Sequence, residues 1–512
     1  MVRFPSKGVS SMAKKSGWVM WVLVLGSMAV LSMAQPAVVD EKPGPRALYV
    51  DDRLNPLGID DPAPRFSWQI HDDTRGARQT AYEIQVASSV ESLRQDKANV
   101  WDSGRIESGA TMNVHYAGPA LEPSTRYHWR VKVWDASGKP YAGAEDQFGW
   151  WETALLKQEG WQAKWIGYET PEEAAVRHAP AAWIASPDAA TLAAEKPKQQ
   201  QVAYRQSVSL AKPIRHATLF ATGQDTVSAW VNGALVLTAA AFPPWGQMPW
   251  KKFVGADVTR NLSQGSNAIA IETVHYVGDP NGAVHADAPP MIATLVVEYE
   301  DGKTETFASN AEWKTAIHPP GGWTAKTFDD GAWKPAAAFT QHPGPMNSAP
   351  LGHPWIPDLV KGLRHTFSVG KPVKSARLYS TALGVYEVFL NGDRVGNDIM
   401  APGWTDYREH VKYQTYDVTA QIAKGDNAIG ALLAPGWYET PIEWFQQPNN
   451  YGDTPPALRA QLRIEYADGT VQWEATDATW EASTRNILHS ELYDGESQDA
   501  QLISDGWATA GY

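Results

Sequence analysis

Two stretches of the chain decide its fold. Residues 213–220 read PIRHATLF, and residues 372–379 repeat them as PVKSARLY. The same order returns in three later pairs of segments: WVNG at 230–233 and FLNG at 389–392, DVT at 257–259 and 417–419, and EYEDG at 298–302 and EYADG at 465–469. Collinear matches of this kind indicate an internal duplication.

The repeated segments have the sequence pattern of antiparallel strands. Asn232-Gly233 and Asn391-Gly392 each follow alternating apolar residues, and Asn-Gly is a typical hairpin turn. No long stretch shows the 3.6-residue period of a helix. We therefore predict two duplicated jelly-roll sandwiches, at 161–340 and 355–512, with the Pro- and Gly-rich stretch 342–357 as the linker between them.

A smaller module precedes the duplication. Alternation of apolar and polar residues recurs at 82–86 (YEIQV) and at 127–134 (YHWRVKVW), which is typical of half-buried strands. The segment 43–156 has the size of one seven-stranded sandwich of the fibronectin-III or immunoglobulin kind. Nothing in it has a catalytic pattern, so we interpret it as a spacer or docking module. The whole chain is predicted to be all-β.

The first 34 residues have the order of an export signal. A basic stretch containing Arg3 and Lys14 precedes an apolar run from Trp18 to Leu31, and the small residue Ala34 stands before Gln35. The run is short for a membrane span. We predict a signal peptide at 1–34 and a secreted or periplasmic protein. An uncleaved N-terminal anchor is the alternative.

Composition excludes several classes of function. The chain has no cysteine, which excludes disulfides, thiolate metal sites and a cysteine nucleophile. Its net charge of −13 repels nucleic acid and anionic lipid. Its 24 tryptophans offer flat faces that suit sugar rings, although most tryptophans in proteins are core residues.

Four sets of motifs resemble the N-terminal region of the bacterial α-L-rhamnosidases of glycoside hydrolase family 78. They are NPLGI at 55–59 with PRFSW at 64–68, WDSG at 101–104 with YHWRV at 127–131, FLNG at 389–392 with PGWT at 402–405, and GWY at 436–438 with YDGE at 493–496. The likeness runs from about Leu48 to Tyr512. It implies a secreted protein that acts on rhamnosides.

The resemblance also implies a helical (α/α)6 barrel that carries the catalytic acids beyond Tyr512. No segment here matches the family's active-site pattern, so no catalytic residue is assigned and the 512-residue chain alone is expected to be inactive. Hydrolysis of a glycoside needs two facing carboxyl groups. The acids available in the loops are Glu439, Glu443, Asp494 and Glu496. Sequence leaves open whether any two of them converge.

Loops that differ between the copies are where ligand contacts are expected, because the duplicated scaffold places them on one rim. In the second copy these loops combine aromatic faces with polar acceptors, a combination that suits a sugar. The predicted carbohydrate-binding residues are Trp404, Asp406, Trp437, Tyr438, Glu443 and Trp444. The alternative is that the same residues pack against the catalytic barrel.

One loop of the first copy offers possible metal ligands, His275, Asp279, His285 and Asp287. Their spacing fits no standard zinc pattern, and calcium prefers more carboxylates and carbonyls. No cofactor is predicted, but calcium stays possible because some rhamnose-binding modules of this architecture use it. Metal ligands are left unassigned.

Two hypotheses of function follow. In the first, the chain is the accessory and carbohydrate-binding half of a secreted α-L-rhamnosidase, with a rhamnose-containing saccharide and the catalytic barrel as its partners. In the second, it is a free-standing, lectin-like protein that binds rhamnose without catalysis. The genomic sequence downstream of codon 512 distinguishes them.

Overall fold

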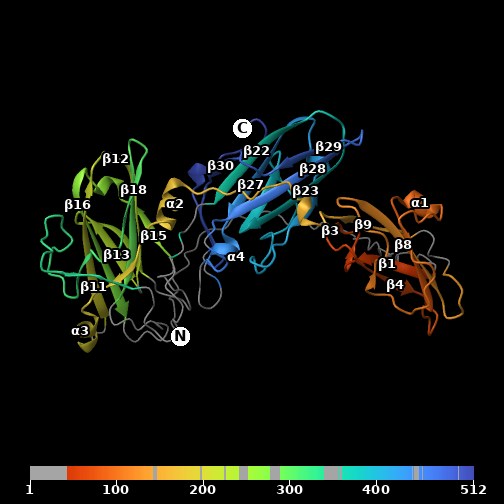
Figure 1. Ribbon diagram of the computed structural model, residues 1–512, viewed down its shortest axis with the longest axis horizontal. Helices are drawn as coiled ribbons and strands as arrows, with labels where there is room; N and C mark the ends of the chain where they lie inside the picture. The colour runs from red at the N-terminus through yellow and green to blue at the C-terminus, as the bar shows by residue number, and fades with distance from the viewer. Residues whose placement is uncertain are drawn as a thin grey trace, which may run out of the picture.

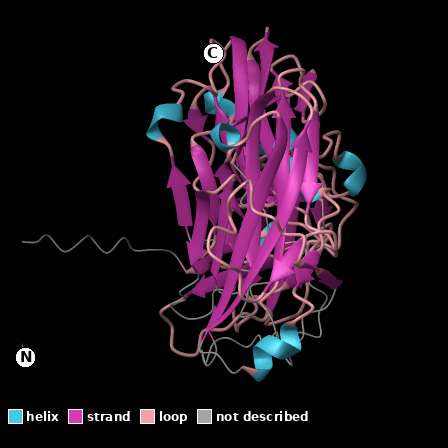
Figure 2. Cartoon of the chain, turned by 90° about the vertical axis from the view of Figure 1, so that its left-hand side faces the viewer, coloured by secondary structure: helices cyan, strands magenta, loops and turns pink. Residues whose placement is uncertain are grey.

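The computed structural model describes residues 43–141, 147–195, 199–223, 226–240, 252–276, 289–339, 354, 356, 360–440, 442, 449–452, 454–493 and 495–512. Strands dominate these residues (Figure 2). The helices described are short: α1 (Val90–Arg94), α2 (Pro171–Arg177), α3 (Ala189–Ala194) and α4 (Gly436–Glu439). The prediction of an all-β sandwich fold is confirmed. The export signal at 1–34 lies outside the described residues.

The first module is an immunoglobulin-like sandwich of two sheets. One sheet has the order β2 (Arg53–Leu54), β1 (Gly44–Val50), β4 (Arg65–His71) and β7 (Val114–His115). The other has the order β3 (Leu57–Ile59), β9 (Gly149–Thr153), β8 (Arg126–Trp134), β5 (Ala81–Ala87) and β6 (Trp101–Asp102). Phe66, Trp129 and Trp151 are fully buried between them and stabilise the module by burying large aromatic area.

The first copy of the duplication is a larger sandwich. One sheet is ordered β15 (Val254–Asp257), β12 (Ile214–Gly223), β17 (Met291–Tyr299), β10 (Trp183–Ala185), β21 (Ala337–Phe339), with β18 (Thr304–Ala308) also pairing with β17. The facing sheet is ordered β14 (Ala234–Ala240), β13 (Thr226–Val231), β16 (Gly265–Tyr276), β11 (Gln199–Leu210), β19 (Lys314–Ala316), β20 (Lys334–Pro335).

The second copy repeats this arrangement. One sheet is ordered β26 (Gln414–Asp417), β23 (Val373–Leu383), β28 (Ala457–Tyr466), β29 (Val471–Ala475). The facing sheet is ordered β25 (Asp393–Arg394), β24 (Val385–Leu390), β27 (Gly425–Ala434), β22 (Lys361–Val369), β30 (Glu481–Thr484). A separate hairpin joins β31 (Ile487–Glu491) to β32 (Gly495–Gln498). The duplication in the sequence is therefore a duplication of strand order.

A hydrogen-bonded pair of asparagines, one of them buried, explains why the same residues recur in both copies. The Asn232 side-chain amide donates to the Asn267 side-chain oxygen at 2.9 Å, and Asn391 donates to Asn427 at 2.7 Å. Asn232 and Asn391 both adopt a left-handed backbone at the hairpin turn, with φ of 52° and 53°. Each Asn pair therefore ties a hairpin turn to the strand beside it in the sheet, β16 in the first copy and β27 in the second.

The second sandwich also receives a strand-like segment from much earlier in the chain. Ile166 pairs with Leu458 on β28, and the Lys164 backbone N–H donates to the Thr476 carbonyl at 2.7 Å. In the first sandwich, Ile184 pairs with Met291 in the same way. The segment around Ile166 thus pairs with the second sandwich before the chain forms the first sandwich. The chain then returns to complete the second sandwich. Figure 1 shows the result: the second sandwich lies between the immunoglobulin-like module and the first sandwich.

Buried ion pairs fix both neighbours to the second sandwich. On one side, Glu173 of α2 accepts from the Lys361 ammonium at 2.6 Å. On the other side, Arg377 of β23 contacts the two carboxylate oxygens of Glu152 at 2.5 and 3.0 Å. The Tyr379 hydroxyl donates to Ser124 at 2.7 Å across the same interface. Such pairs impose a defined geometry, since each charge is costly to bury without its partner.

Candidate functional site

The loop after β25 carries the first half of the predicted sugar-binding set. The stretch of this loop just before Trp404 is fixed to β24, because the Tyr386 backbone N–H donates to the Ala401 carbonyl at 3.0 Å. A cis peptide joins Ala401 to Pro402, and Gly403 has a φ of 95°, which glycine adopts without strain. Trp404 directly follows this glycine and is 47% exposed.

Trp437 and Tyr438 of the set come from α4, at the end of β27, and the structure brings Trp437 together with Trp404. The rings of Trp404 and Trp437 are parallel, with centroids 6.4 Å apart and planes within 4°. The Trp404 indole N–H donates to the Tyr451 hydroxyl at 2.6 Å. We call the surface formed by Trp404, Trp437 and Tyr451 the aromatic rim.

A buried group of tyrosines supports the aromatic rim from below. The Tyr407 ring lies 4.9 Å from that of Tyr451 and 5.4 Å from that of Tyr438. Tyr407 and Tyr438 are buried, and burial raises the pKa of the Tyr407 hydroxyl well above its ordinary value. Tyr438, which we expected to contact sugar, therefore lies beneath the rim rather than on it.

Asp406 lies on the rim as one half of a local ion pair. Its carboxylate accepts the Arg408 side chain at 2.9 and 2.8 Å, and hydrogen bonds from the Arg408 side chain and backbone lower the pKa of Asp406. The Arg408 guanidinium also lies 5.7 Å from the Tyr451 ring centroid. The rim thus presents an ionised acceptor and a cationic donor beside its flat faces.

The remaining predicted residues divide between described and undescribed parts of the chain. Glu443 and Trp444 lie outside the described residues, as does Asp494. Glu439 is buried at the end of α4 and pairs with Arg177 of α2 at 2.7 Å. Glu496 is exposed on β32 and accepts from Gln498 at 3.1 Å. The structure thus places Glu439 in an ion pair with α2 and Glu496 on the C-terminal hairpin.

Of the possible metal ligands, only His275 is described, and it is buried at the end of β16 opposite Gln200. Asp279, His285 and Asp287 lie outside the described residues. Within the ranges that the structure describes, no three His, Asp or Glu side chains gather in a way that holds a metal ion.

Sequence reasoning missed three residues: Tyr451 of the aromatic rim, Tyr407 beneath it and Arg408 beside it. Tyr407 and Arg408 directly follow Asp406 in the sequence, so their closeness to the predicted site could have been inferred. Tyr451 had no such signal, because only the folded loop brings it under Trp404.

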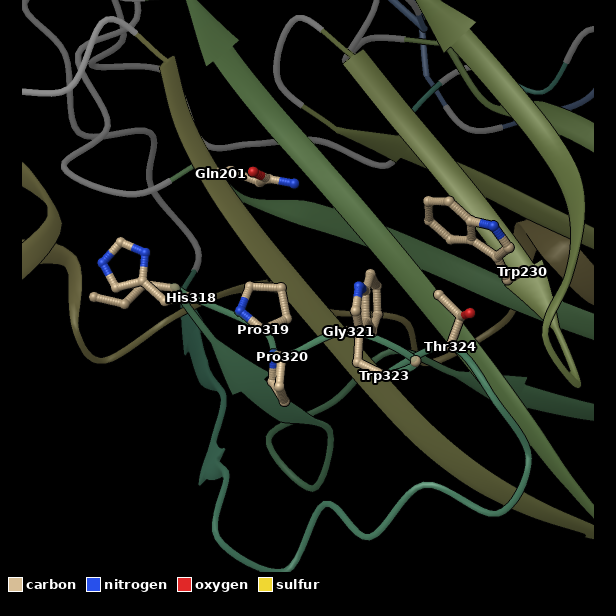
Figure 3. Close-up of a pocket in the computed structure, with 10 residues that line it drawn as sticks. Gln201, Trp230, His318, Pro319, Pro320, Gly321, Trp323 and Thr324 are labelled. Carbon is tan, nitrogen blue, oxygen red and sulfur yellow. The ribbon is translucent and has the colours of Figure 1, made fainter.

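Apart from the aromatic rim, a hollow of about 580 Å³ lined partly by tryptophans lies on the first sandwich over β11 and β13. In the view of Figure 3, His318 lies at one side and Trp230 at the other, with Trp323 between them. Two of its polar side chains are engaged: His318 contacts Glu195 at 3.0 Å, and Gln201 donates to Glu272.

The fold and the aromatic rim define a multi-module β-sandwich protein, and comparison with known proteins places it in a family. The model for the alpha-L-rhamnosidase N-terminal domain matches residues 212–319 and 371–512, one range in each copy. The Rha78A-like, N-terminal immunoglobulin domain matches residues 45–157. The chain belongs to the α-L-rhamnosidase family, glycoside hydrolase family 78, and corresponds to the N-terminal region of its members.

Individual relatives agree with the family models. An α-L-rhamnosidase of Streptomyces avermitilis is 38% identical over 472 residues, which is 89% of this chain and 42% of the relative. One from Formosa agariphila is 24% identical over 464 residues, 90% of this chain and 32% of the relative. The crystal structure of the Streptomyces avermitilis α-L-rhamnosidase complexed with L-rhamnose has a TM-score of 0.69 and 36% identity, covering 92% of this chain and 44% of that one. The chain spans less than half the length of these relatives.

Among the described residues, no helix is long and apolar enough to span a bilayer; the longest, α2, has seven residues.

Proposed function

We propose that this chain is the accessory, carbohydrate-binding N-terminal region of a secreted α-L-rhamnosidase, and that its aromatic rim binds a rhamnose-containing saccharide. The observation that supports the proposal is the parallel pair Trp404 and Trp437, which the loop after β25 and the helix α4 hold side by side. Indole faces take up the C–H patches of a sugar ring, and the ionised Asp406 accepts hydrogen bonds from its hydroxyl groups.

The ion pair between Asp406 and Arg408 does not compete strongly with such a ligand. Both side chains are exposed, at 41% and 63%, so the pair is screened by water and contributes little to stability. A sugar hydroxyl that donates to Asp406 leaves Arg408 free to donate to a ring or linking oxygen. Binding then exchanges one set of exposed hydrogen bonds for another, while the aromatic contacts supply the free energy.

The experiment is a titration of L-rhamnose followed by tryptophan fluorescence, with Trp437→Ala as the test variant. We expect binding to weaken by about 1 to 2 kcal/mol, because a loop aromatic contributes face contact more than core volume. Trp150→Ala is the matched control, since Trp150 is half-buried on the immunoglobulin-like module under Arg126. If the Trp437→Ala protein melts at a much lower temperature, Trp437 has a structural role, since truncating a buried Trp lowers the free energy of unfolding by about 3 to 5 kcal/mol.

A second candidate function is favoured by a different observation. Ile399 and Met400 lie beside the rim and are 82% and 39% exposed, and they line a hollow of about 510 Å³ that also touches β31 and β32. Exposed apolar side chains next to one another are typical of interfaces. In this alternative the surface packs against a catalytic domain. A wild-type chain that never binds L-rhamnose, and whose Trp437→Ala variant melts normally, supports that interface.

A further inference from the structure

A third hollow lies where the immunoglobulin-like module meets the second sandwich. It has a volume of about 370 Å³, within the usual range for a small-ligand pocket. Its walls come from both modules and the segment between them: Asp60, Leu156, Trp161, Trp165, Tyr413 and Arg459. We call it the junction pocket.

The walls of the junction pocket are held in place by contacts between the modules. The Leu155 backbone N–H donates to the Tyr413 hydroxyl at 3.1 Å, and the Trp161 ring packs edge-on against that of Tyr413 at 5.4 Å. The buried pair of Arg377 and Glu152 fixes the same interface. A ligand therefore meets a preformed pocket, which reduces the entropy lost on binding.

Arg459 projects from β28 into this pocket between two indole rings. Its guanidinium carbon lies 4.7 Å from the Trp161 ring centroid and 5.9 Å from that of Trp165. Its Nε–H donates to the Ala163 carbonyl at 2.9 Å. These contacts hold the planar guanidinium in one orientation, as an anion-binding arginine requires.

The charge on Arg459 is not balanced by an acidic side chain. Among the described residues, its two terminal nitrogens have no hydrogen-bond or ion-pair partner. Burial lowers the pKa of Arg459, and no carboxylate offsets that effect. Arg377 shows the opposite case: burial opposes its charge, but the hydrogen bond to Glu152 and the nearby negative charges of Glu152 and Asp417 together raise its pKa.

The other charged groups of the pocket leave room for an anion. Asp60 is engaged, because its carboxylate accepts the Leu156 backbone N–H at 2.6 Å. Lys157 and His410 are exposed on the wall of the pocket, as is Glu409, whose carboxylate makes no hydrogen bond within the described residues. Glu409 is expected to weaken anion binding without blocking it.

We propose that the junction pocket binds a sugar that carries a carboxylate, a uronate unit. The terminal nitrogens of Arg459 donate two parallel hydrogen bonds to the carboxylate, and the exposed ring of Trp165 takes the sugar face. This inference goes beyond the proposed function, since the pocket shares only Tyr407 with the structures that form and support the aromatic rim. The two surfaces suit neighbouring units of one glycan.

The test is calorimetric titration of the full chain with three probes: methyl β-D-glucuronide, methyl β-D-glucoside and acetate. The glucuronide is expected to bind about tenfold or more tightly than either other probe, because only it offers both a charge and a ring. Arg459→Gln removes the preference over the glucoside, and Trp165→Ala removes the preference over acetate. Glu409→Gln strengthens glucuronide binding. Arg215→Gln, an exposed arginine of the first sandwich, is the control.

Equal binding of glucuronide and glucoside overturns the proposal, as does a glucuronide affinity that Arg459→Gln leaves unchanged. Binding of acetate as tight as that of glucuronide identifies a simple anion site and also overturns it. Melting curves show that each variant is folded. Since Trp165 is 39% exposed, Trp165→Ala keeps the test decisive if Arg459→Gln fails to fold. An L-rhamnose titration of the same variants reports the proposed function separately.

Discussion

The joint between the immunoglobulin-like module and the second sandwich depends on one buried ion pair, and Arg377→Met tests it. The Arg377 and Glu152 side chains are 8% and 6% exposed. Arg377 also contacts Asp417 at 2.8 Å, and Glu152 also contacts Arg126 at 3.0 Å. Removing Arg377 therefore leaves a buried carboxylate with one half-exposed partner.

The expected cost follows from that geometry. Removing one partner of a buried ion pair costs about 3 to 5 kcal/mol, because the remaining charge stays desolvated. Since Arg126 still compensates Glu152 in part, we expect about 3 kcal/mol for Arg377→Met. Glu152→Gln leaves Arg377 with Asp417 and is expected to cost about 2 kcal/mol. The double variant should lose at least about 1 kcal/mol less than the sum, because the two side chains interact directly.

The assay is urea unfolding followed by tryptophan fluorescence, with limited proteolysis around Gln158 as a second measure of the joint. Arg215→Met is the matched control, because Arg215 and Glu298 form an exposed pair whose loss costs under about 1 kcal/mol. An Arg377→Met variant as stable as that control, with unchanged proteolysis, refutes the reasoning. So does a double variant whose cost equals the sum of the single costs.

Three further predictions concern pH, export and activity. Burial raises the pKa of the Tyr386 hydroxyl well above its ordinary 10, so the stability it contributes is complete below pH 10 and is lost as the pH rises through its folded pKa. The melting temperature should therefore fall between about pH 10 and 11, and less so in Tyr386→Phe; equal falls contradict this. N-terminal sequencing of the exported protein should begin near Gln35, and a full-length cytoplasmic product contradicts the export signal. The 512-residue chain should not hydrolyse an aryl α-L-rhamnoside above the buffer blank; turnover that Glu496→Gln abolishes contradicts this.

The parts of the fold that sequence predicts well are those set by local chemistry. Asn391-Gly392 is a hairpin turn because that pair tolerates a left-handed backbone, and the same logic holds for Asn232-Gly233. Alternating residues then fix which faces are buried. The pairing of Ile166 with Leu458 has no such signal, since it joins residues almost 300 positions apart through backbone groups. The joint at Arg377 was likewise hidden, because a lone Arg on a strand reads as solvent-facing.

The candidate site shows the same division. Trp404 and Trp437 are both on the rim because both follow strands of one sheet, which the duplication made predictable. Tyr438 was expected on the surface, but consecutive residues of the short α4 point to different sides, and Tyr438 packs on Tyr407. The junction pocket could not be predicted, because Arg459 and Trp161 are distant in sequence and meet only after two modules dock.

The most direct test of the proposed function is a crystal structure of this chain grown with L-rhamnose. We predict a sugar ring against the exposed faces of Trp404 or Trp437, with a hydroxyl group donating to Asp406. A rim without sugar, in crystals where L-rhamnose is bound at another surface of the chain and the rim is open to solvent, contradicts the account.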